Sequence, residues 1–430
     1  MKWILNELIE GTGAWVASGD PATVIDGGVV DSRGDVAGRL FVGVPGESTD
    51  GGLHAPAALA AGAAAALVGA RAWTAIGAEV ASSNRAVIVA EDPLAVLQEA
   101  GRRALARTHA TVVAITGSVG KTTTKDILVA MLRTAGTRVY GTPGNRNTDV
   151  GVPLSMLDMP EDTEVAVVEM GMRGSGQIAD LVALAPPHVA CITSVAPVHL
   201  EILGTIDAIA AAKAEIFSGL GAGDVAVVPD DEPLLDAAVA RLADGVVVRR
   251  FADLPVGVDI GLEKAWQRRN AAAAWECCVA LGRVPAAGAP IDVALSAMRG
   301  QERPLAGGGV LIEDCYNANP IAMGAALRDL AARDGRRVAV LGDMMELGPD
   351  EDRFHREVGE LVAELGIDVL VAVGSRAAGY VEGAADVTAV RFPDSAAAAN
   401  GVPAILQPGD TVLVKASRGV ALERVCEVLA

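Results

Sequence analysis

Residues 114–128, AITGSVGKTTTKDIL, constrain the fold of this chain more than any other stretch. The β-branched run TVVAI at residues 111–115 is typical of a buried parallel strand. Apolar residues at positions 127, 128, 131 and 132 recur at helical spacing. A strand that passes through a glycine-containing turn into a helix predicts an α/β unit with a turn that can bind phosphate.

The turn carries the groups that a bound phosphate needs. Its glycines allow the backbone N–H groups to point inward, and the helix N-terminus adds positive potential. Lys121 is placed to neutralise the β- and γ-phosphates, and the Thr122 hydroxyl to reach a magnesium ion. We predict that an ATP-type nucleotide binds through Gly117, Ser118, Val119, Gly120, Lys121, Thr122 and Thr123.

The spacing of this turn leaves an alternative. A standard phosphate loop has a glycine five residues before the glycine of its Gly-Lys pair, and that position here is Ile115. With Gly117 leading, the loop is a tighter variant, or else an ordinary glycine-rich turn. The flanking strand and helix favour nucleotide binding, with Lys121 on an exposed loop, but they do not fix the reaction.

Composition sets the class of the chain. A length of 430 residues allows two to four domains. Aromatic residues make up only 3%, so the core must consist of Ala, Val, Leu and Ile, as in α/β sheets covered by alanine-rich helices. A formal charge of −19 argues against nucleic-acid or anionic-membrane partners.

Cysteine spacing and the N-terminus indicate the compartment. The five cysteines include no CxxC pair, which predicts reduced thiols and neither a disulfide framework nor a zinc site. Glu7 and Glu10 interrupt the first apolar stretch and argue against a signal peptide. No apolar run suggests a spanning helix. We therefore expect a cytoplasmic protein without membrane insertion, and a monomer.

Residues 1–108 are predicted to form a small α/β unit. We expect a short helix at residues 3–8, followed by strands and an alanine-rich helix. The polar loop of Asp31, Ser32 and Arg33 is either a surface turn or a ligand contact.

Residues 109–296 alternate strands with helices, and two strands end in polar residues. Glu169 lies at the end of the strand pattern at 164–171, and His199 at the end of the pattern at 188–200. Ligands of open α/β sheets bind beyond the carboxyl ends of strands. We expect both residues to converge with the phosphate loop on a metal or nucleotide, although each alone could be structural.

A lysine follows on an alanine-rich helix. Asp207 is predicted to cap this helix, which we expect at residues 208–220. Lys213 is either a lysine that extends its charge to the surface or a functional group, and the residues alone leave both open.

Residues 297–430 repeat a strand–loop–helix pattern that is typical of a doubly wound sheet. No GxGxxG motif opens it, so a nicotinamide cofactor is not indicated. The strand-end loops are surface turns or a substrate face. They carry Asp314, Asn317, Asn319, Asp343, Glu346, Lys415 and Arg418.

In combination, these motifs resemble the Mur ligase family over nearly the whole chain. The matching segments are GSVGKTTTKDIL, GNRNTDVGVPLSML, VVEMGM, PHVACITSVAPVHLEILGT, AKAEIF, EDCYNANPIAM, VAVLGDMMELG and VLVKASRG. The resemblance implies a three-domain α/β architecture. A UDP-substrate-binding domain would span residues 1–108, a P-loop ATPase-like domain 109–296 and a Rossmann-like domain 297–430.

The resemblance also implies an activity. Enzymes of this family are ATP- and Mg²⁺-dependent amide ligases that pass the γ-phosphoryl group to a carboxylate and let an amine attack the acyl phosphate. The YNANP and LGDMMELG segments are similar to the branch that adds D-alanyl-D-alanine to a UDP-N-acetylmuramoyl tripeptide in peptidoglycan synthesis. Partners would be these small molecules.

Site residues follow by the same resemblance. Lys121, His199 and Lys213 are the implied catalytic residues, and Thr122, Glu169, His199 and Lys213 the implied metal ligands. Lys213 matches a lysine that carbon dioxide carbamylates in several members. Further implied contacts are Asn270 with adenine, Arg299 with phosphates, Asp314 with ribose, and Asp31, Ser32, Arg33, Asn145, Asn317 and Asn319 with substrates.

Some positions depart from the family pattern. Asn147-Thr148 replaces the usual Asn-Asn, Trp266 stands where histidine is common, and Met298 where glycine is usual. The segment at 230–270 is short for the small antiparallel sheet that usually lies there. Two alternatives stay open: a Mur-like ligase for another carboxylate, in a cofactor or secondary-metabolite pathway, and a non-catalytic nucleotide-binding paralogue.

Overall fold

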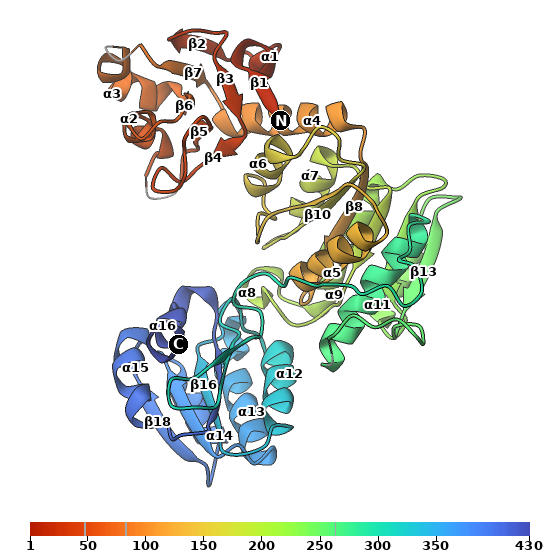
Figure 1. Cartoon of the computed structure of the whole chain (residues 1–430), viewed down its shortest axis with the longest axis vertical. Coiled ribbons are helices and arrows are strands. Elements are labelled where there is room, and N and C mark those ends of the chain that lie inside the picture. Colours follow the sequence, from red (N-terminus) through yellow and green to blue (C-terminus); the bar gives the residue numbers. More distant parts are fainter. Residues whose placement is uncertain (47–48, 82–83, 263) are drawn as a thin grey trace.

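The computed structural model describes residues 1–46, 49–81, 84–262 and 264–430. Three α/β units follow one another along the molecule, with the N-terminal unit (red to orange) at one end and the C-terminal unit (blue) at the other (Figure 1). Each unit contains one main sheet. Within the described residues, none of the helices has the length and apolar character needed to cross a bilayer.

The N-terminal unit is built on a five-stranded sheet of order β2-β7-β6-β5-β4, with a separate β1-β3 pair. Trp3 lies in strand β1, so the helix expected at residues 3–8 begins only at Leu5. The elements are β1 (Lys2–Ile4), α1 (Leu5–Ile9), β2 (Trp15–Ser18), β3 (Val24–Asp26), β4 (Gly28–Val29), β5 (Leu40–Gly43), η1 (Gly51–His54), α2 (Ala55–Ala60), β6 (Ala65–Gly69), α3 (Ala70–Ala81), β7 (Ala86–Ala90) and α4 (Pro93–Thr108).

The central unit has a six-stranded parallel sheet of order β13-β12-β11-β8-β10-β9. Its elements are β8 (Thr111–Thr116), α5 (Lys121–Thr134), β9 (Val139–Gly141), α6 (Gly151–Asp158), β10 (Val165–Glu169), α7 (Gln177–Leu184), β11 (Val189–Ile192), α8 (Leu200–Leu203), α9 (Ile206–Ala214), η2 (Glu215–Gly219), β12 (Val225–Pro229), η3 (Pro233–Leu235), α10 (Asp236–Val239), β13 (Val247–Phe251) and α11 (Ala265–Ala280). In the described part of the 230–270 segment, the one strand is β13, and it pairs in parallel with β12.

Strand β8 shows why this sheet is covered on both faces. Val112 and Ala114 pack into one apolar cluster, and Val113 and Ile115 pack into another on the opposite face. Such two-sided burial is expected of a parallel strand with a continuous apolar run. From β8 the chain goes first to β9 and β10 on one side and then to β11 on the other. Ligand sites of open α/β sheets lie at this kind of switch point.

The C-terminal unit has a six-stranded sheet of order β14-β15-β19-β16-β17-β18, parallel except for the β14–β15 pair. Its elements are β14 (Gln301–Pro304), β15 (Val310–Glu313), α12 (Pro320–Ala331), β16 (Arg337–Gly342), η4 (Gly348–Asp350), α13 (Glu351–Glu364), β17 (Val369–Val373), α14 (Ala377–Gly383), β18 (Thr388–Phe392), α15 (Ser395–Gly401), η5 (Val402–Ala404), β19 (Thr411–Lys415), η6 (Arg418–Val420) and α16 (Glu423–Leu429).

The junction between the first two units is close-packed. Helix α4 runs from the N-terminal sheet onto the central unit (Figure 1), and a Cβ on Gly101 would lie 2.6 Å from Pro153 of α6. Asp158, the last residue of α6, forms ion pairs with Arg39 of the N-terminal unit and with Arg146. Because apolar and ionic contacts both cross it, this junction holds the two units in one orientation.

Candidate active site

The phosphate loop is closed by its own lysine. The backbone turns at Gly117 (φ 152°) and again at Gly120 (φ 87°), the residue before α5. Lys121 is the first residue of α5, and its Nζ donates a hydrogen bond of 2.7 Å to the Gly117 carbonyl. Lys121 is therefore half-buried at a helix N-terminus, and the expectation of an exposed loop is wrong. Burial lowers its pKa, and nearby Glu169 opposes that effect.

The segment after β11 braces this loop. Thr193 Oγ1 donates to the Val119 carbonyl over 2.6 Å, and the Ser118 N–H donates to the Ser194 carbonyl over 2.9 Å. A Cβ on Gly117 would lie 1.9 Å from Thr193 Oγ1, so only glycine fits at that position. The tighter loop variant is thus stabilised by a neighbouring strand end.

Helix α11 approaches the loop from another side. A Cβ on Gly120 would lie 2.3 Å from Asn270 Oδ1, so the Asn270 amide packs directly on the loop. Asn270 therefore lies beside the phosphate loop, and its contact with adenine stays a prediction. Trp266, one turn earlier, lies against Gly300, where a Cβ would be 3.6 Å from its ring. The Trp266 side chain, which replaces the histidine common in the family, therefore packs against the start of the C-terminal unit.

Glu169 has a buried oxygen without a hydrogen bond. The residue ends β10 and is 1% exposed. Its Oε1 accepts a hydrogen bond of 2.8 Å from Asn147 Nδ2, while its Oε2 has no hydrogen-bond partner. Lys125 Nζ lies 3.8 Å from Oε2. A buried carboxylate oxygen of this kind is a ready ligand for a cation.

Lys125 is a site residue that the sequence reasoning missed. It is 2% exposed, and its Nζ donates to the carbonyls of Thr142 (2.8 Å) and Gly144 (2.7 Å). It thereby fixes the 142–147 loop, which carries Asn147, beside Glu169. The signal was available, because Lys125 follows Lys121 at the four-residue spacing that places both on one helix face.

The C-terminal unit reaches the loop through Arg299. Its Nη2 donates to Thr122 Oγ1 over 3.1 Å, and its guanidinium carbon lies 3.9 Å from the centre of the Tyr316 ring. Burial raises the pKa of Tyr316, and Arg299 lowers it. Tyr316 was also not predicted as a site residue, because its place in the YNANP segment does not show which cation it contacts.

His199 is held by a residue of the C-terminal unit. Its Nδ1 lies 2.6 Å from Glu346 Oε2, and both residues have left-handed backbones, with φ of 56° and 64°. Burial lowers the pKa of His199 most, Lys121 and Lys213 lower it further, and Glu346 opposes them. The effects of Lys121 and Lys213 on the pKa of His199 agree with the predicted convergence, and the role of this group in binding a metal or nucleotide stays a prediction.

Lys213 is buried, and this excludes the interpretation that it extends its charge to the surface. It is 2% exposed on α9, and among the described residues it forms no hydrogen bond or ion pair. Burial lowers its pKa well below the ordinary value, and Lys121 lowers it further. The helix ends sooner than expected, since α9 passes into η2 after Ala214, and Thr205 is its N-cap in place of Asp207.

The candidate residues of the C-terminal loops are held within their own unit. Lys415 Nζ forms a 2.7 Å ion pair with Asp314 and donates to the Asn317 carbonyl over 3.0 Å. Asn319 caps α12 through its side-chain oxygen and is 3% exposed, so its amide nitrogen is what remains for a ligand. Asp314 and Asn317 are thus fixed by one buried lysine.

The remaining candidate substrate contacts lie in the polar loop at 31–33 of the N-terminal unit and at Asn145 in the 142–147 loop of the central unit. Arg33 forms an exposed pair with Asp31, its Nη2 lying 2.8 Å from the carboxylate, and Arg33 lowers the pKa of Asp31. Ser32 is half-buried, and Asn145 is exposed. Within the described residues, no hydrogen bond or ion pair links these four side chains to the phosphate loop.

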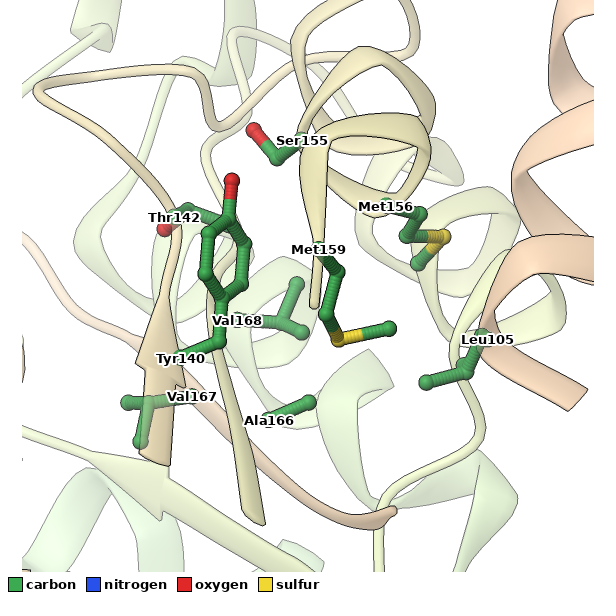
Figure 2. A pocket seen from close by; sticks show the side chains of 9 residues that line it. All are labelled: Leu105, Tyr140, Thr142, Ser155, Met156, Met159, Ala166, Val167 and Val168. Atoms are coloured by element: carbon green, nitrogen blue, oxygen red, sulfur yellow. The ribbon is translucent and has the colours of Figure 1, made fainter. Parts of the chain in front are cut away.

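A small cavity lies behind the 142–147 loop (Figure 2). Its volume of about 10 Å³ is near the minimum for one water molecule, far below what a nucleotide needs. The Tyr140 hydroxyl has no hydrogen-bond partner and points toward Ser155 and Thr142 in Figure 2. The cavity is lined by Leu105, Tyr140, Thr142, Ser155, Met156, Met159, Ala166, Val167 and Val168.

Two cysteines meet although their spacing gave no sign of it. Ligand atoms of Glu313, Cys315 and Cys426 all lie within 4.8 Å of one another, and all three residues are buried. Arg303 Nη2 lies 2.6 Å from the Glu313 carboxylate and already balances its charge. Contact with Cys315 and burial raise the pKa of the Cys426 thiol, which disfavours the thiolate that a metal would need.

Comparisons with known proteins agree with this geometry. Residues 115–252 match the model of the Mur ligase middle domain, and residues 298–418 match that of the Mur ligase, glutamate ligase domain. A Bacillus subtilis protein named UDP-N-acetylmuramoyl-tripeptide–D-alanyl-D-alanine ligase is 34% identical, over 95% of this chain and 93% of its own. The Escherichia coli protein of the same name is 31% identical, over 94% of each chain.

Solved structures are similar over the same length. MurF from Acinetobacter baumannii superposes with a TM-score of 0.82 at 27% identity, covering 99% of this chain and 98% of that one. MurF from Thermotoga maritima, in complex with ADP, gives 0.76 at 29% identity, covering 93% and 96%. The predicted three-domain α/β architecture is confirmed. The chain belongs to the Mur ligase family, on the branch that these relatives represent.

Proposed function

We propose that this chain is an ATP-dependent ligase that joins D-alanyl-D-alanine to a UDP-N-acetylmuramoyl tripeptide during peptidoglycan precursor synthesis. The observation that carries the proposal is the arrangement around α5 and its phosphate loop. Lys121 closes the loop through Gly117, the buried Glu169 carboxylate lies 3.8 Å from Lys125 Nζ of the same helix, and Arg299 of the C-terminal unit donates to Thr122. The names of relatives that match over nearly the whole chain supply the substrates.

The proposed reaction has two transfers. A carboxylate oxygen of the tripeptide attacks the γ-phosphorus of ATP, and ADP leaves. The amine of D-alanyl-D-alanine then attacks the acyl carbon, phosphate leaves with the former carboxylate oxygen, and the nitrogen loses a proton to give the amide. Phosphorylation is needed because a free carboxylate is a poor electrophile, so the protein mainly positions groups and balances charge.

The donor atoms fit magnesium. Mg²⁺ prefers oxygen ligands, and the site offers the Thr122 hydroxyl, which accepts from Arg299, and Glu169 Oε2, which has no hydrogen bond and faces Lys125 at 3.8 Å; His199 would add a nitrogen ligand. When bound, the ion would neutralise phosphate charge during transfer. Lys121 and Arg299, which contact the loop from two units, would hold the phosphates in place.

Lys213 fits the same site once it is carbamylated. As a cation it would repel a metal, but its lowered pKa leaves more of the neutral amine, whose nitrogen can attack carbon dioxide and release a proton. The carbamate would supply anionic oxygen to a second Mg²⁺. This step explains why the helix buries a lysine without a partner.

We infer that parts of the substrates distant from the reacting phosphate contact residues outside the phosphate loop. We assign Asn270 to the adenine and Asp314 to the ribose, and the polar loop at 31–33 to the UDP-sugar. Asn145, Asn317 and Asn319 would contact the peptide and the incoming dipeptide. ATP and a UDP-linked substrate do not cross membranes, so we place the reaction in the cytoplasm, carried out by a monomer.

A phosphate-release screen tests the proposal. The enzyme is mixed with ATP, Mg²⁺ and pairs of UDP-muramoyl peptides and dipeptides, and we expect release only with a tripeptide plus D-alanyl-D-alanine. Release with another carboxylate would assign the chain to a different pathway. Nucleotide binding without release for any pair would indicate a regulator. Failure to support growth of a strain that lacks this ligase activity would favour a ligase for another carboxylate.

A further inference from the structure

The contact between His199 and Glu346 crosses from the central unit to the C-terminal unit. Glu346 Oε2 lies 2.6 Å from His199 Nδ1. An ionised carboxylate only accepts hydrogen bonds, so Nδ1 must carry the proton, and Nε2 is then the ring nitrogen with a free lone pair. Metal-binding histidines characteristically donate their other N–H to such a carboxylate, which fixes both tautomer and ring direction.

Both carboxylate oxygens of Glu346 contact residues of the central unit. Oε1 lies 3.7 Å from Arg173 Nε, in the turn after β10. The carboxylate therefore bridges two loops of the central unit, the one after β10 and the one after β11. The Arg173 contact adds a weak, solvent-exposed attraction on the side of the carboxylate away from His199.

The backbone is shaped for this contact at both ends. His199 and Glu346 have φ of 56° and 64°, values that are uncommon for residues with a side chain and often mark functional sites. On the central side, Leu200 packs against the core of the C-terminal unit. On the other side, a Cβ on Gly348 would lie 3.2 Å from the Glu201 nitrogen, so the two turns are in direct contact.

The loop that carries Glu346 is fixed within the C-terminal unit. The Met344 N–H donates to His355 Nε2 and the Met345 N–H donates to Ser417 Oγ, each over 3.0 Å. Upstream, the Tyr380 hydroxyl donates to the Gly342 carbonyl over 2.9 Å. The backbone that leads to Glu346 is therefore held to the rest of the C-terminal unit.

We propose that Glu346 is the positioning residue through which the C-terminal unit sets the tautomer and orientation of His199, so that the metal site of the central unit is completed by docking of the C-terminal unit. This rests on the proposed role of His199 as a metal ligand. It goes further because the metal site then depends on two units: the central unit supplies the ligand His199, and the C-terminal unit supplies Glu346, its hydrogen-bond partner.

The decisive experiment measures the tautomer of His199 in the full chain without metal. Long-range proton–nitrogen NMR spectra of ¹⁵N-histidine-labelled protein report which ring nitrogen is protonated, and a His199→Gln variant identifies the signal among the five histidines. We expect the Nδ1–H form in the parent and in Glu346→Gln, whose amide oxygen still accepts. We expect a shift toward the Nε2–H form in Glu346→Ala.

A second readout measures Mn²⁺ binding by electron paramagnetic resonance. Glu346→Ala should weaken binding by about 10–100-fold, and Glu346→Gln by less than about 10-fold. Glu382→Ala, which removes an exposed carboxylate 3.2 Å from Arg356 on the same unit, is the matched control and should change neither readout. Circular dichroism confirms that each variant is folded.

An unchanged tautomer in a folded Glu346→Ala variant, or Mn²⁺ affinity equal to that of the parent, would overturn the inference. These results differ from failure of the proposed function. A parent that shows the expected tautomer and its loss in Glu346→Ala, yet releases no phosphate with any substrate pair, would keep the coupling and reject the ligase assignment.

Discussion

Lysines at three positions of the central unit differ in what their ammonium groups contact. Lys121 is half-buried and bonds to the Gly117 carbonyl of its own loop. Lys125 is buried and bonded to two carbonyls, and Lys213 is buried without a hydrogen bond or ion pair in the described residues. A buried cation without a partner is costly, so its retention points to chemistry more than to packing.

Substituting Lys121 tests the phosphate loop. Lys121→Ala should lower substrate-dependent phosphate release by about 10²–10³-fold, because a donor aimed at transferring phosphate is lost. The fold should survive, since the lost hydrogen bond to Gly117 contributes only about 0.5–1.5 kcal/mol. Phosphate release and thermal unfolding are compared with Lys2→Ala, an exposed lysine on β1. Release equal to that of the parent would reject the loop assignment.

Substituting Lys213 tests the carbamate. Lys213→Ala should lose turnover, and short-chain carboxylic acids should restore part of it by placing carboxylate oxygens in the vacated space, whereas amines should not. Turnover is measured over a concentration series of formate, acetate and methylamine. Full activity in Lys213→Ala, or equal rescue by the amine, would remove the carbamate from the mechanism.

Among the structural elements, the loop between β16 and α13 depends on a buried histidine. His355 Nε2 accepts the Met344 N–H, and its Nδ1 lies 2.7 Å from the Glu351 carbonyl and therefore carries the proton. His355 is 0% exposed and packs against the Tyr380 ring, with 4.7 Å between ring centres and a tilt of 53°. A neutral histidine with both nitrogens engaged fixes the loop that presents Glu346.

This histidine should make the stability of the fold sensitive to acid. Burial lowers the pKa of His355 below its ordinary value of 6.5, so the unfolded chain binds the proton first as the pH falls. The unfolding free energy should therefore decrease below about pH 6.5, by up to about 1.4 kcal/mol per pH unit from this group, until its folded-state pKa is reached.

Urea unfolding at pH 7.5, 6.5 and 5.5 measures this effect. His355→Gln should be less stable than the parent at pH 7.5, by about 1–2 kcal/mol from lost hydrogen bonds, but should lose less stability on acidification. His54→Gln, at an exposed histidine, is the control and should follow the parent. Parallel pH profiles for the parent and His355→Gln would contradict the prediction.

At the scale of the whole molecule, each outer unit is joined to the central unit in a different way. The N-terminal unit is held through α4 and the ion pairs of Asp158. The C-terminal unit is held through polar contacts at the active site, from Arg299 to Thr122 and from Glu346 to His199, and through the apolar packing of Leu200. Nucleotide and metal would therefore bind between surfaces that can separate, as closure during turnover requires.

The Asp158 junction gives a prediction at this scale. Asp158→Ala leaves Arg39 and Arg146 without their shared carboxylate, and should lower the unfolding free energy by about 1–3 kcal/mol, because the group is largely buried. It should also raise the KM for the UDP-linked substrate more than the KM for ATP. Asp162→Ala, in an exposed pair with Arg138, should change neither. Equal effects on both KM values would contradict this.

Much of the site could be predicted because the residues lie at strand ends. Glu169 is the last residue of β10, and parallel strands carry such residues to one edge of the sheet. The strand expected at 188–200 ends already at Ile192, and His199 is the N-cap of α8, so the pattern predicted its side of the sheet and not its place at a strand end. Glu346 was recognised only as a polar loop residue, because its partner lies 147 positions away in the chain. Lys125 was missed because helical periodicity does not show which carbonyls a buried ammonium meets.

The amino-acid sequence by itself determined the α/β class, the strand–loop–helix for phosphate and the order of the three units. These follow from periodicity and turn chemistry, which act over a few residues. Tertiary structure alone decided that Lys213 is buried, that Tyr316 stacks on Arg299, and that Glu346 meets His199. Burial and contact between units depend on how distant surfaces pack, and no local pattern encodes that packing.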